Sequence, residues 1–276
     1  MSLILALATA SCVAEAEPDE EFEFRCLSGM ASGLIGLDLV DIGGTPDISG
    51  TYANVFSNTK VALAGNFTLD GSAISGGSVT IAGTRLPGSS IIENATGITV
   101  SDPSAHVTAH KTNNDNAKIP CITKGNKCTS PVVAGVLTLA SQQSLTLRSG
   151  NYYFTGVSMS GQSELTVDGT ATIYLDGGAT FNGGSSCHGG GSLTVISSSS
   201  SEIKLNGGGS TAMQIYAPRA TVRFAGTQGF RGSALGKQLI ISGTADLTVV
   251  SDIAGGGGYV ACPPDGPSNT PPHGGQ

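Results

Sequence analysis

Tryptophan is absent from this 276-residue chain, and charged residues make up only 12% of it. The 13 Lys and Arg residues are scattered singly, which leaves no basic stripe for a nucleic acid or an anionic membrane surface. The apolar run from Leu3 to Ala14 is shorter than the roughly 20 residues that a membrane-spanning helix needs. Sustained helical periodicity with caps is missing from the central region, so we predict no long helix there.

Glycine and hydrophobic residues are plentiful instead. The chain has 41 Gly, about twice the usual share of ~7%, and 39% of its residues are hydrophobic. Pro and Gly together stay below the roughly 25–30% that is typical of disordered chains. A net charge of −7 makes the protein acidic. The composition therefore predicts a folded chain with many turns that does not bind nucleic acid.

The most regular pattern is a triplet in which two apolar residues flank Thr, Lys or Arg. Successive side chains of a strand point to opposite faces, so each triplet predicts a short strand that buries its outer residues and exposes the middle one. Turn-forming glycines lie between the triplets, as at Gly76–Gly77. The eleven triplets begin at Phe67, Val79, Ile98, Leu137, Leu145, Leu165, Ala171, Leu193, Ile203, Val222 and Leu247.

Short strands of this kind occur in sandwiches, barrels and solenoids, and an internal repeat favours the solenoid. Residues Met159–Val167 match Ile241–Val249 position for position in character, at an offset of 82 residues. That offset fits about three coils of ~27 residues, within the ~20–50 residue range of solenoid repeats. We therefore predict an all-β protein, a right-handed parallel β-solenoid with short strands and Gly-rich turns.

The two ends of the chain differ in composition from its centre. Residues 17–29 continue an acidic run that begins at Glu15, and like charges at this density predict an extended tether. Residues 255–276 are rich in Gly, Pro and Ser, which is typical of a disordered tail. Between them we expect the solenoid over residues 30–254, interrupted near 103–131 by a polar loop insertion.

Residues 1–16 have the features of an atypical export signal. Ala14–Ala16 offers a signal-peptidase site, whereas Ala10–Cys12 resembles the end of a lipobox, which would leave Cys12 lipidated. Positive charge before the apolar run is missing, because the first basic residue is Arg25; a misplaced start codon would have the same effect. We expect an extracellular or outer-surface protein without a membrane span, with a lipid anchor as the open alternative.

Six cysteines fit an exported protein better than a cytosolic one. Cys121 and Cys128 bracket a short loop and are the best disulfide candidates. Cys26 and Cys262 flank the expected domain and are candidates for a second bond across it. Cys187 would then remain without a partner.

Three segments resemble a known group of proteins: Asn54–Asn66, Leu147–Gly161 with its Gly-Asn-Tyr-Tyr-Phe run, and Ile215–Val222 with its Ile-Tyr-Ala-Pro run. They are similar to the Gly/Asn-rich β-solenoid domains of unknown function in bacterial surface proteins and in pilus-associated proteins of the tight-adherence type. The resemblance covers roughly residues 50–254. It implies an extracellular, non-enzymatic role and supplies no catalytic residues. The long anchor helix of pilin-like members is not visible in this sequence.

Two groups of side chains could hold a metal, and each has a simpler explanation. His106 and His110 share one face of a helix or a strand, upstream of Cys121 and Cys128, but a zinc site needs four converging ligands. Surface histidines beside a disulfide loop explain the pattern better. Asn113–Asn116 is rich in oxygen yet lacks the acidic spacing of a calcium loop, which favours an Asx-rich turn. We therefore predict no metal and no other cofactor.

The remaining candidates concern catalysis and water binding. Cys187 precedes His188, but neighbours on a strand face opposite ways. Asp168 and Asp176 are carboxylates that adjoining strands could bring together, although nothing aligns them in the cleft that glycoside hydrolysis requires. Stacked outward Thr side chains could order water or ice. Only Thr170–Thr172 has the paired pattern of a flat ice-binding face, so ordinary β-propensity explains the outward Thr residues better.

We therefore expect a non-catalytic extracellular or cell-surface module with a structural or adhesive role. Its expected partners are other surface proteins or surface glycans. A carbohydrate- or ice-binding solenoid is the first alternative, and a polysaccharide lyase or hydrolase is the second. We predict no enzymatic activity, because no pair of acids is placed for proton transfer.

Overall fold

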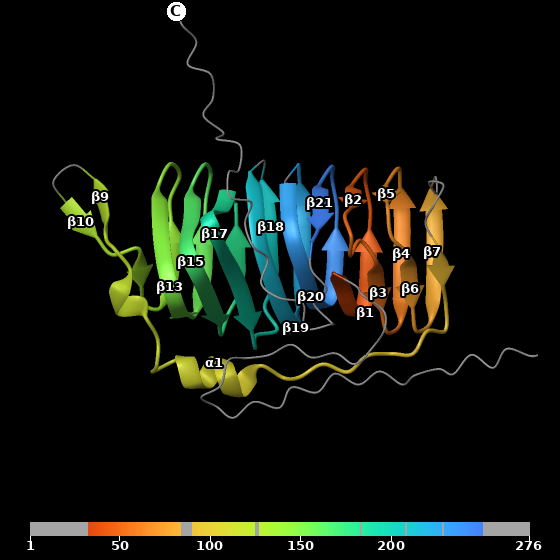
Figure 1. Cartoon of the computed structure of the whole chain (residues 1–276), viewed down its shortest axis with the longest axis horizontal. Helices are drawn as coiled ribbons and strands as arrows, with labels where there is room; N and C mark the ends of the chain where they lie inside the picture. Colours follow the sequence, from red (N-terminus) through yellow and green to blue (C-terminus); the bar gives the residue numbers. More distant parts are fainter. Residues whose placement is uncertain are drawn as a thin grey trace, which may run out of the picture.

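The computed structural model describes residues 33–83, 90–124, 127–182, 184–207, 209–227 and 229–250, without the side chains of residues 124 and 184–191. Its strands stack in parallel, coil upon coil, into a β-solenoid of about 10 turns (Figure 1). The predicted fold class is confirmed. The helices of the described residues are short, as expected: α1 (Ser104–His110) and the 3-10 helix η1 (Asn116–Lys118).

Each coil contributes strands to three parallel ladders, and long strands bend from one ladder into the next. The first ladder holds the last parts of β1 (Leu34–Ile42), β19 (Ser210–Gly226) and β20 (Gly229–Ile241), with β4 (Lys60–Gly65), β7 (Ser78–Gly83), β12 (Val136–Leu139), β14 (Gly156–Met159), β16 (Ala179–Phe181) and β18 (Ile203–Gly207). The second holds β2 (Asp47–Ser49), β5 (Thr68–Leu69) and β21 (Asp246–Val249), with the first parts of β13 (Ser144–Phe154), β15 (Glu164–Leu175), β17 (Gly184–Ser197), β19 and β20. The third holds β3 (Val55–Ser57), β6 (Ala73–Ser75) and β8 (Ile91–Ile92), with the remaining parts of the long strands.

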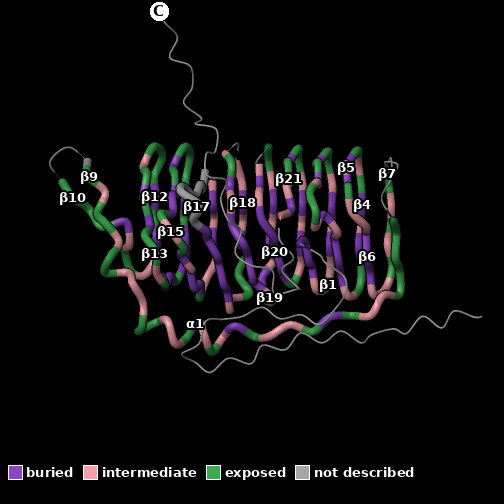
Figure 2. The backbone as a smooth tube through the Cα atoms, in the orientation of Figure 1, coloured by how far each residue is buried: buried purple, intermediate pink, exposed green. Residues whose placement is uncertain are grey.

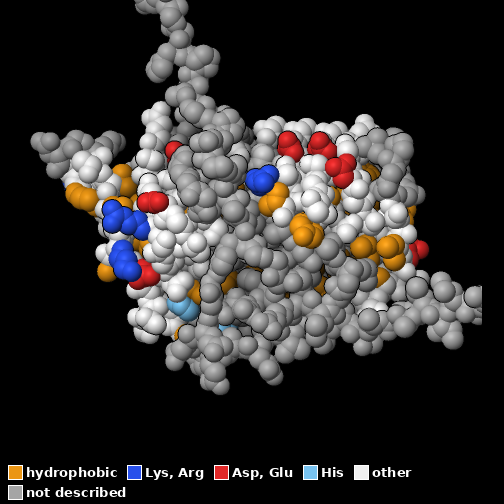
Figure 3. All heavy atoms as spheres, viewed as in Figure 1, with side chains coloured by type: hydrophobic (Ala, Val, Ile, Leu, Met, Phe, Trp, Pro, Cys, Tyr) orange, Lys and Arg blue, Asp and Glu red, His pale blue; other side chains and the backbone are white. Residues whose placement is uncertain are grey.

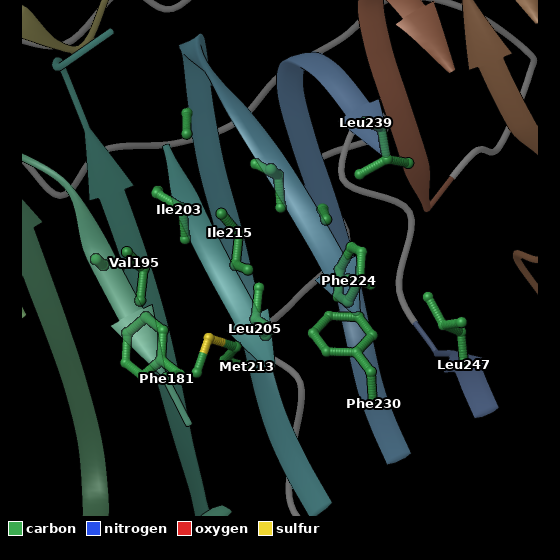
Figure 4. Close-up of a cluster of buried hydrophobic side chains, with 14 of the residues drawn as sticks. Phe181, Val195, Ile203, Leu205, Met213, Ile215, Phe224, Phe230, Leu239 and Leu247 are labelled. Carbon is green, nitrogen blue, oxygen red and sulfur yellow. The ribbon is translucent and has the colours of Figure 1, made fainter. Parts of the chain in front are cut away.

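The triplets build the core because their two apolar residues point inward together. Leu137, Leu165 and Leu247, each the first residue of a triplet, have no exposed surface. Buried stretches run through the coils of the stack in Figure 2, except along β7 at its end. Figure 4 shows how neighbouring coils interlock at the centre, where the rings of Phe224 and Phe230 meet edge to face with centroids 4.7 Å apart.

The chain does not fill the stack from one end to the other. β1 pairs in parallel with β20, and β2 with β21, so the first coil of the described chain stacks on its last coil in the middle of the molecule. From there the chain runs through β3 to β8 toward one end, crosses to the other end, and returns from β12 to β21 (Figure 1). Tyr52 bonds to both termini of the domain: its carbonyl accepts from Gly33 N–H at 3.0 Å, and its N–H donates to Val249 at 3.5 Å.

The two repeated segments occupy equivalent places, but the predicted coil length is wrong. Leu165 and Leu247 belong to one column of the second ladder, and the coils between them place Ser185, Thr211 and Phe230 in the same column. These positions mark four coil steps of 20, 26, 19 and 17 residues instead of three of ~27. The spacing is irregular because the coils differ in length between their paired segments, where the pairing register shifts, as between Asp168 and Thr170 and between Ser185 and Thr194.

A column of glycines forms the corner between the first and second ladders. Gly207 and Gly226 are in register, as are Gly65 and Gly83. All members have positive φ, a conformation that costs an L-residue about 1–2 kcal/mol. A Cβ added to Gly243 would lie 2.6 Å from the carbonyl oxygen of Gly226 in the adjacent coil. The column consists of Gly207 (127°), Gly226 (90°), Gly243 (93°), Gly44 (88°), Gly65 (93°) and Gly83 (152°).

Residues 93–131, here called the connector, cross from one end of the stack to the other along the outside of the third ladder. α1 lies within this segment and runs beneath the coils in Figure 1. One of the eleven triplets, Ile98–Val100, belongs to the connector and not to a coil. Ile98 and Val107 are buried there at 6% and 1% exposure, against side chains that point outward from the coils.

Those outward side chains form a second apolar cluster, here called the outer apolar column. Each member follows an inward apolar residue and stands in register with a member in the next coil. The connector therefore shields hydrophobic surface that an isolated coil stack would expose. The column comprises Tyr153, Tyr174, Ile196, Tyr216, Leu235, Ile35, Phe56, Ile74 and Ile92.

Polar contacts fix the connector in place. The side-chain amide of Asn58 donates to Ile98 O at 2.9 Å and accepts from Ile98 N–H at 2.7 Å, as a neighbouring strand would. The hydroxyl of Tyr216 donates to Ser101 O at 2.7 Å, and burial raises the pKa of this phenol. Arg219 forms an ion pair with Asp102 at 2.6 Å, with about half of each side chain exposed.

We expect Asn58→Asp to loosen the connector around Ile98. The carboxylate cannot donate to Ile98 O, so a largely buried carbonyl loses its partner, at a cost of about 1–3 kcal/mol. Hydrogen exchange of the Ile98 amide should become about tenfold faster or more, while the coil amides keep their protection. Arg219→Ala is the control, since an exposed ion pair contributes about 1 kcal/mol or less. Unchanged exchange at Ile98 would contradict this role of Asn58.

Candidate functional surfaces

A disulfide-closed hairpin projects from the end of the stack that begins with β12 (Figure 1). β9 (Ile122–Lys124) and β10 (Lys127–Thr129) pair antiparallel, with Lys127 opposite Lys124. Cys121 and Cys128 form a disulfide with their Cα atoms 5.5 Å apart, which is the pairing expected from the sequence. All residues of β10 are exposed, so the bond stabilises a ribbon whose outer strand does not contribute to the core.

We expect the Cys121→Ser, Cys128→Ser double variant to loosen the hairpin and leave the solenoid intact. Closing so short a loop stabilises the hairpin locally by about 2–3 kcal/mol in the chain-entropy model. Hydrogen exchange should accelerate over β9 and β10, while the main thermal transition stays where it is. Mass spectrometry of unreduced peptides checks the bond itself, and free thiols at both positions would contradict it.

The two histidines considered for zinc lie on α1, and His110 faces the coils. The His110 ring stacks on Tyr174, with centroids 3.7 Å apart and planes 7° from parallel, and its Nδ1 lies 2.9 Å from His106 O. Burial, and then the charge of His110, lower the pKa of His106. Cys121 and Cys128 are bonded to each other and so cannot act as thiolate ligands. His110 therefore holds α1 against the outer apolar column.

The Asn-rich segment considered for calcium caps β13 in the coil at the hairpin end. The Asn116 amide donates to Tyr153 O at 2.6 Å and accepts from Tyr153 N–H at 3.1 Å. Asp115 accepts from Asn151 N–H at 2.8 Å and forms an ion pair with Lys118 at 2.8 Å. The hydrogen bonds from Lys118 and Asn151 lower the pKa of Asp115. These side chains form hydrogen bonds with the backbone groups at the outer edge of β13. They take the place of the next strand, which is missing at this end of the ladder.

The two carboxylates considered for catalysis do not approach each other. Asp168 and Asp176 flank the straight segment 170–175 of one coil, and six residues at about 3.3 Å each separate them by about 20 Å. Glycosidase carboxylates lie about 5–10 Å apart. Asp176 instead accepts from the Tyr153 hydroxyl at 3.1 Å, and burial together with this carboxylate raises the pKa of Tyr153.

The outward rows of the described coil residues are mixed in composition and form no uniform Thr array. On the second ladder, Thr146 and Thr166 are in register with their hydroxyls 2.9 Å apart. On the third, Thr172 is in register with Thr194, which is itself buried at 4% exposure. The middle row of the first ladder reads Thr138, Ser158, Thr180, Lys204, Arg223, Ile240, Asp41, Ala62 and Thr80.

Several predicted residues lie where the structure describes little or nothing. Cys12, Cys26 and Cys262 fall outside the described residues. Cys187 and His188 lie opposite Val167 and Asp168 in β17, without described side chains. Within the described ranges no group of three or more His, Cys, Asp or Glu side chains lies close enough together to hold a metal ion. No helix in that part of the chain has the length and apolar character needed to cross a membrane.

The two ends of the stack differ in how their apolar interior is covered. At the hairpin end, β11 (Val132–Val133) pairs with β12, Ile119 and Ile122 pack on the core, and Leu137 has no exposed surface. At the other end, here called the open end, Ile91 and Ile92 are 38% and 42% exposed. Ile91 occupies an inward position, in register with Ala73, which is buried at 1% exposure.

The first ladder also ends unpaired there. Within the described residues no strand pairs with the outer edge of β7, and its inward residues Val79 and Ile81 are only half-buried. The Glu93 carboxylate accepts from Val79 N–H at 2.7 Å. An acid at this position partly protects the edge from pairing with another strand.

Charge is distributed unevenly along the chain. Only one of the 13 basic residues, but eight of the 20 acids, lie outside residues 33–250, so the solenoid has 12 charges of each sign and no net charge. Residues 33–95 hold five acids and two basic residues, whereas residues 104–135 hold four lysines and one acid. In the view of Figure 3, described side chains on the right third of the molecule include acids and no Lys or Arg, while the hairpin end shows both signs.

No protein-family model matches the chain, and no curated protein is found as a relative. The resemblance to surface and pilus-associated domains therefore stays a prediction from the three quoted segments.

Proposed function

We propose that this chain is a non-catalytic structural or adhesive module of the cell surface or the extracellular space. The main support is the packing of the coils, whose interior is filled by aliphatic and aromatic side chains. The polar groups considered for chemistry make structural contacts instead: Asp115 and Asn116 cap a strand, Asp176 binds a tyrosine, and His110 stacks on another. A partner would therefore recognise the shape of such a rod, its repeated strand edges and its polar surface side chains.

The hairpin disulfide supports the extracellular part of the proposal. Disulfides persist in oxidising compartments and are rare in the cytosol. This bond lies in an exposed ribbon, where reducing agents would reach it. The export features of residues 1–16 point to the same compartment.

The test is to locate the protein on the cells that make it and to compare them with a deletion strain. Antibodies against the solenoid should label intact cells, added protease should remove the label, and the deletion should weaken attachment or alter the surface seen by electron microscopy. A cytoplasmic protein with reduced Cys121 and Cys128 would overturn the proposal. Polysaccharide cleavage that disappears in Asp168→Ala or Asp176→Ala would overturn the non-catalytic role.

A further inference from the structure

We propose that a disulfide bond between Cys26 and Cys262 joins the two ends of the solenoid where they meet in the middle of the stack. From the sequence both residues are only candidates that flank the domain. The fold of the described residues selects this pair. In the cell the bond needs an oxidising compartment and so rests on the proposed function, whereas the choice of partners does not and is tested on the purified full chain.

One coil of the stack is built from both ends of the chain. Its part of the second ladder is β21, which pairs with β20 on one side and with β2 on the other. Its part of the third ladder is the beginning of β1, which pairs with β20 and with β3. In the neighbouring coil, β20 passes from the second ladder into the third without a break. In the shared coil the described chain stops after one ladder and starts at the next, in the middle of the stack (Figure 1).

Hydrogen bonds place the two ends at adjacent positions of this coil. The N–H of Val250 donates to Gly232 O at 3.2 Å. The carbonyl of Gly33 accepts from Ala234 N–H at 2.7 Å. Gly232 and Ala234 are two residues apart in β20, which corresponds to at most about 7 Å. The segments that precede Gly33 and follow Val250 therefore start from the same point of the molecule.

The two cysteines lie close to this point along the chain. Cys26 precedes Gly33 by seven residues, and Cys262 follows Val250 by 12 residues. Measured across the meeting point, about 20 residues separate the two thiols, whereas 236 residues separate them along the sequence. The free energy of closing a loop grows only with the logarithm of its length, and linkers of this order give effective concentrations in the millimolar range. The folded domain therefore favours this pairing.

Most of the other cysteines are not free to compete. Cys121 and Cys128 are bonded to each other. Cys12 would be removed with a signal peptide that ends at Ala16, and in the alternative its sulfur would carry the lipid. Of the six cysteines in the sequence, this leaves Cys187 as the competing thiol.

Cys187 lies away from the meeting point. It takes the register position opposite Val167, which is buried at 1% exposure. Three strand spacings, from β17 through β19 and β20 to β21, correspond to about 14 Å. A disulfide needs Cα atoms about 4–7 Å apart. A bond to Cys187 would therefore have to draw an end segment across the neighbouring coils to a buried register position, whereas Cys26 and Cys262 need no such displacement.

The bond would supply the covalent link that the shared coil lacks. Its formation oxidises two thiols, and the two electrons and two protons pass to a small disulfide such as oxidised glutathione, which is reduced to two thiols. In the unfolded chain the bond closes a loop of 236 residues, but in the folded chain it closes one of about 20 across the meeting point. Because the longer loop loses more entropy on closure, the bond stabilises the folded chain.

The experiment oxidises the purified full chain in a glutathione buffer and maps its unreduced peptides by mass spectrometry. We expect Cys26 and Cys262 in one linked pair of peptides, both in the wild type and in the matched control Cys187→Ser. The double variant Cys26→Ser, Cys262→Ser should melt roughly 4–9 °C below the oxidised wild type, because its unfolded chain is not closed into a loop. Hydrogen exchange should rise in β1 and β21, the strands of the shared coil, and stay unchanged in β12.

Two results would overturn the proposal. The first is an oxidised wild-type chain in which Cys26 or Cys262 is free, is bonded to Cys187, or links two molecules. The second is a double variant with the melting temperature and the β1 and β21 exchange of the oxidised wild type.

Protein taken from cells separates this proposal from the proposed function. A surface protein with the Cys121–Cys128 bond intact and with free thiols at Cys26 and Cys262 would contradict the terminal bond alone. A cytoplasmic protein that forms the Cys26–Cys262 bond only after purification and oxidation would contradict the location alone.

Discussion

Leu165→Asp and Leu247→Asp should each abolish soluble expression or lower the melting temperature sharply. Both leucines point into the core with no exposed surface, and they lie in one column of the second ladder. Leu247 stacks between Phe230 and Ile48, and Leu165 stacks on Leu145, so a carboxylate at either position would be buried without a charged partner. That costs about 3–5 kcal/mol, a large share of the roughly 5–15 kcal/mol by which a typical domain is stable.

The adjacent residues provide matched controls. Glu164 and Asp246 precede the two leucines on the same strands and are exposed. Reversing their charge in Glu164→Lys and Asp246→Lys should change the free energy of unfolding by about 0.5 kcal/mol or less, as most surface substitutions do. Thermal melts of the four variants measure the contrast. If an inward acid were tolerated, or if an outward reversal were as damaging, the inward and outward assignment of these strands would be wrong.

The positions of the strands were predictable because a half-buried strand alternates apolar and polar residues in the sequence. The two flanking residues of triplets such as Leu137–Leu139 are buried and the middle one is exposed, because the side chains of a strand alternate between its two faces. The Ile98–Val100 triplet shows the limit of this logic. It has the same pattern, but it lies in the connector and packs on the outside of the coils. Alternating apolar and polar residues indicate that one face of a segment is buried. They do not indicate which part of the molecule covers that face.

The outer apolar column was missed, although the sequence carried a signal for it. Most coils contain two adjacent apolar residues at the same place, as in Leu34–Ile35, Val55–Phe56 and Ile215–Tyr216. In a strand with one wet face the second residue of such a pair would point to solvent. Its recurrence in successive coils predicts a second covered surface, and a covering segment from elsewhere in the chain.

The order of coils could not be predicted from the sequence. β1 stacks on β20 across roughly 200 residues of chain, and parallel pairing leaves no local turn signal. The equivalence of Leu165 and Leu247 was visible, but the number of coils between them was not, because the coils differ in length between their paired segments. Of the candidate sites, the Cys121–Cys128 pair was the most predictable, since short loops limit the partners a cysteine can reach.

Glycines between the triplets were predicted to form turns, but the alignment of six glycines into a column required the structure. In a single turn, replacing a glycine with positive φ costs about 1–2 kcal/mol. In the column, each glycine also lies against the backbone of the coil beneath it, so a substitution meets two penalties at once. The stability of the stack therefore depends on these glycines more than it would if each one only formed a turn.

Gly44→Ala should lower the stability of the solenoid strongly, and Gly43→Ala should not. Gly44 has a φ of 88°, and a Cβ there would collide with the carbonyl oxygen of Gly243, whereas a Cβ on Gly43 would meet nothing within 4 Å. Backbone strain and the displaced coil together predict a loss of about 2–4 kcal/mol for Gly44→Ala. For a domain of this size the melting temperature should fall by roughly 4–16 °C, while Gly43→Ala shifts it by about a degree or two. The contact joins the first coil of the chain to its last, so hydrogen exchange should rise most across β1 and β20. Equal melting temperatures for the two variants would contradict both the glycine column and the docking of the two chain ends at this corner.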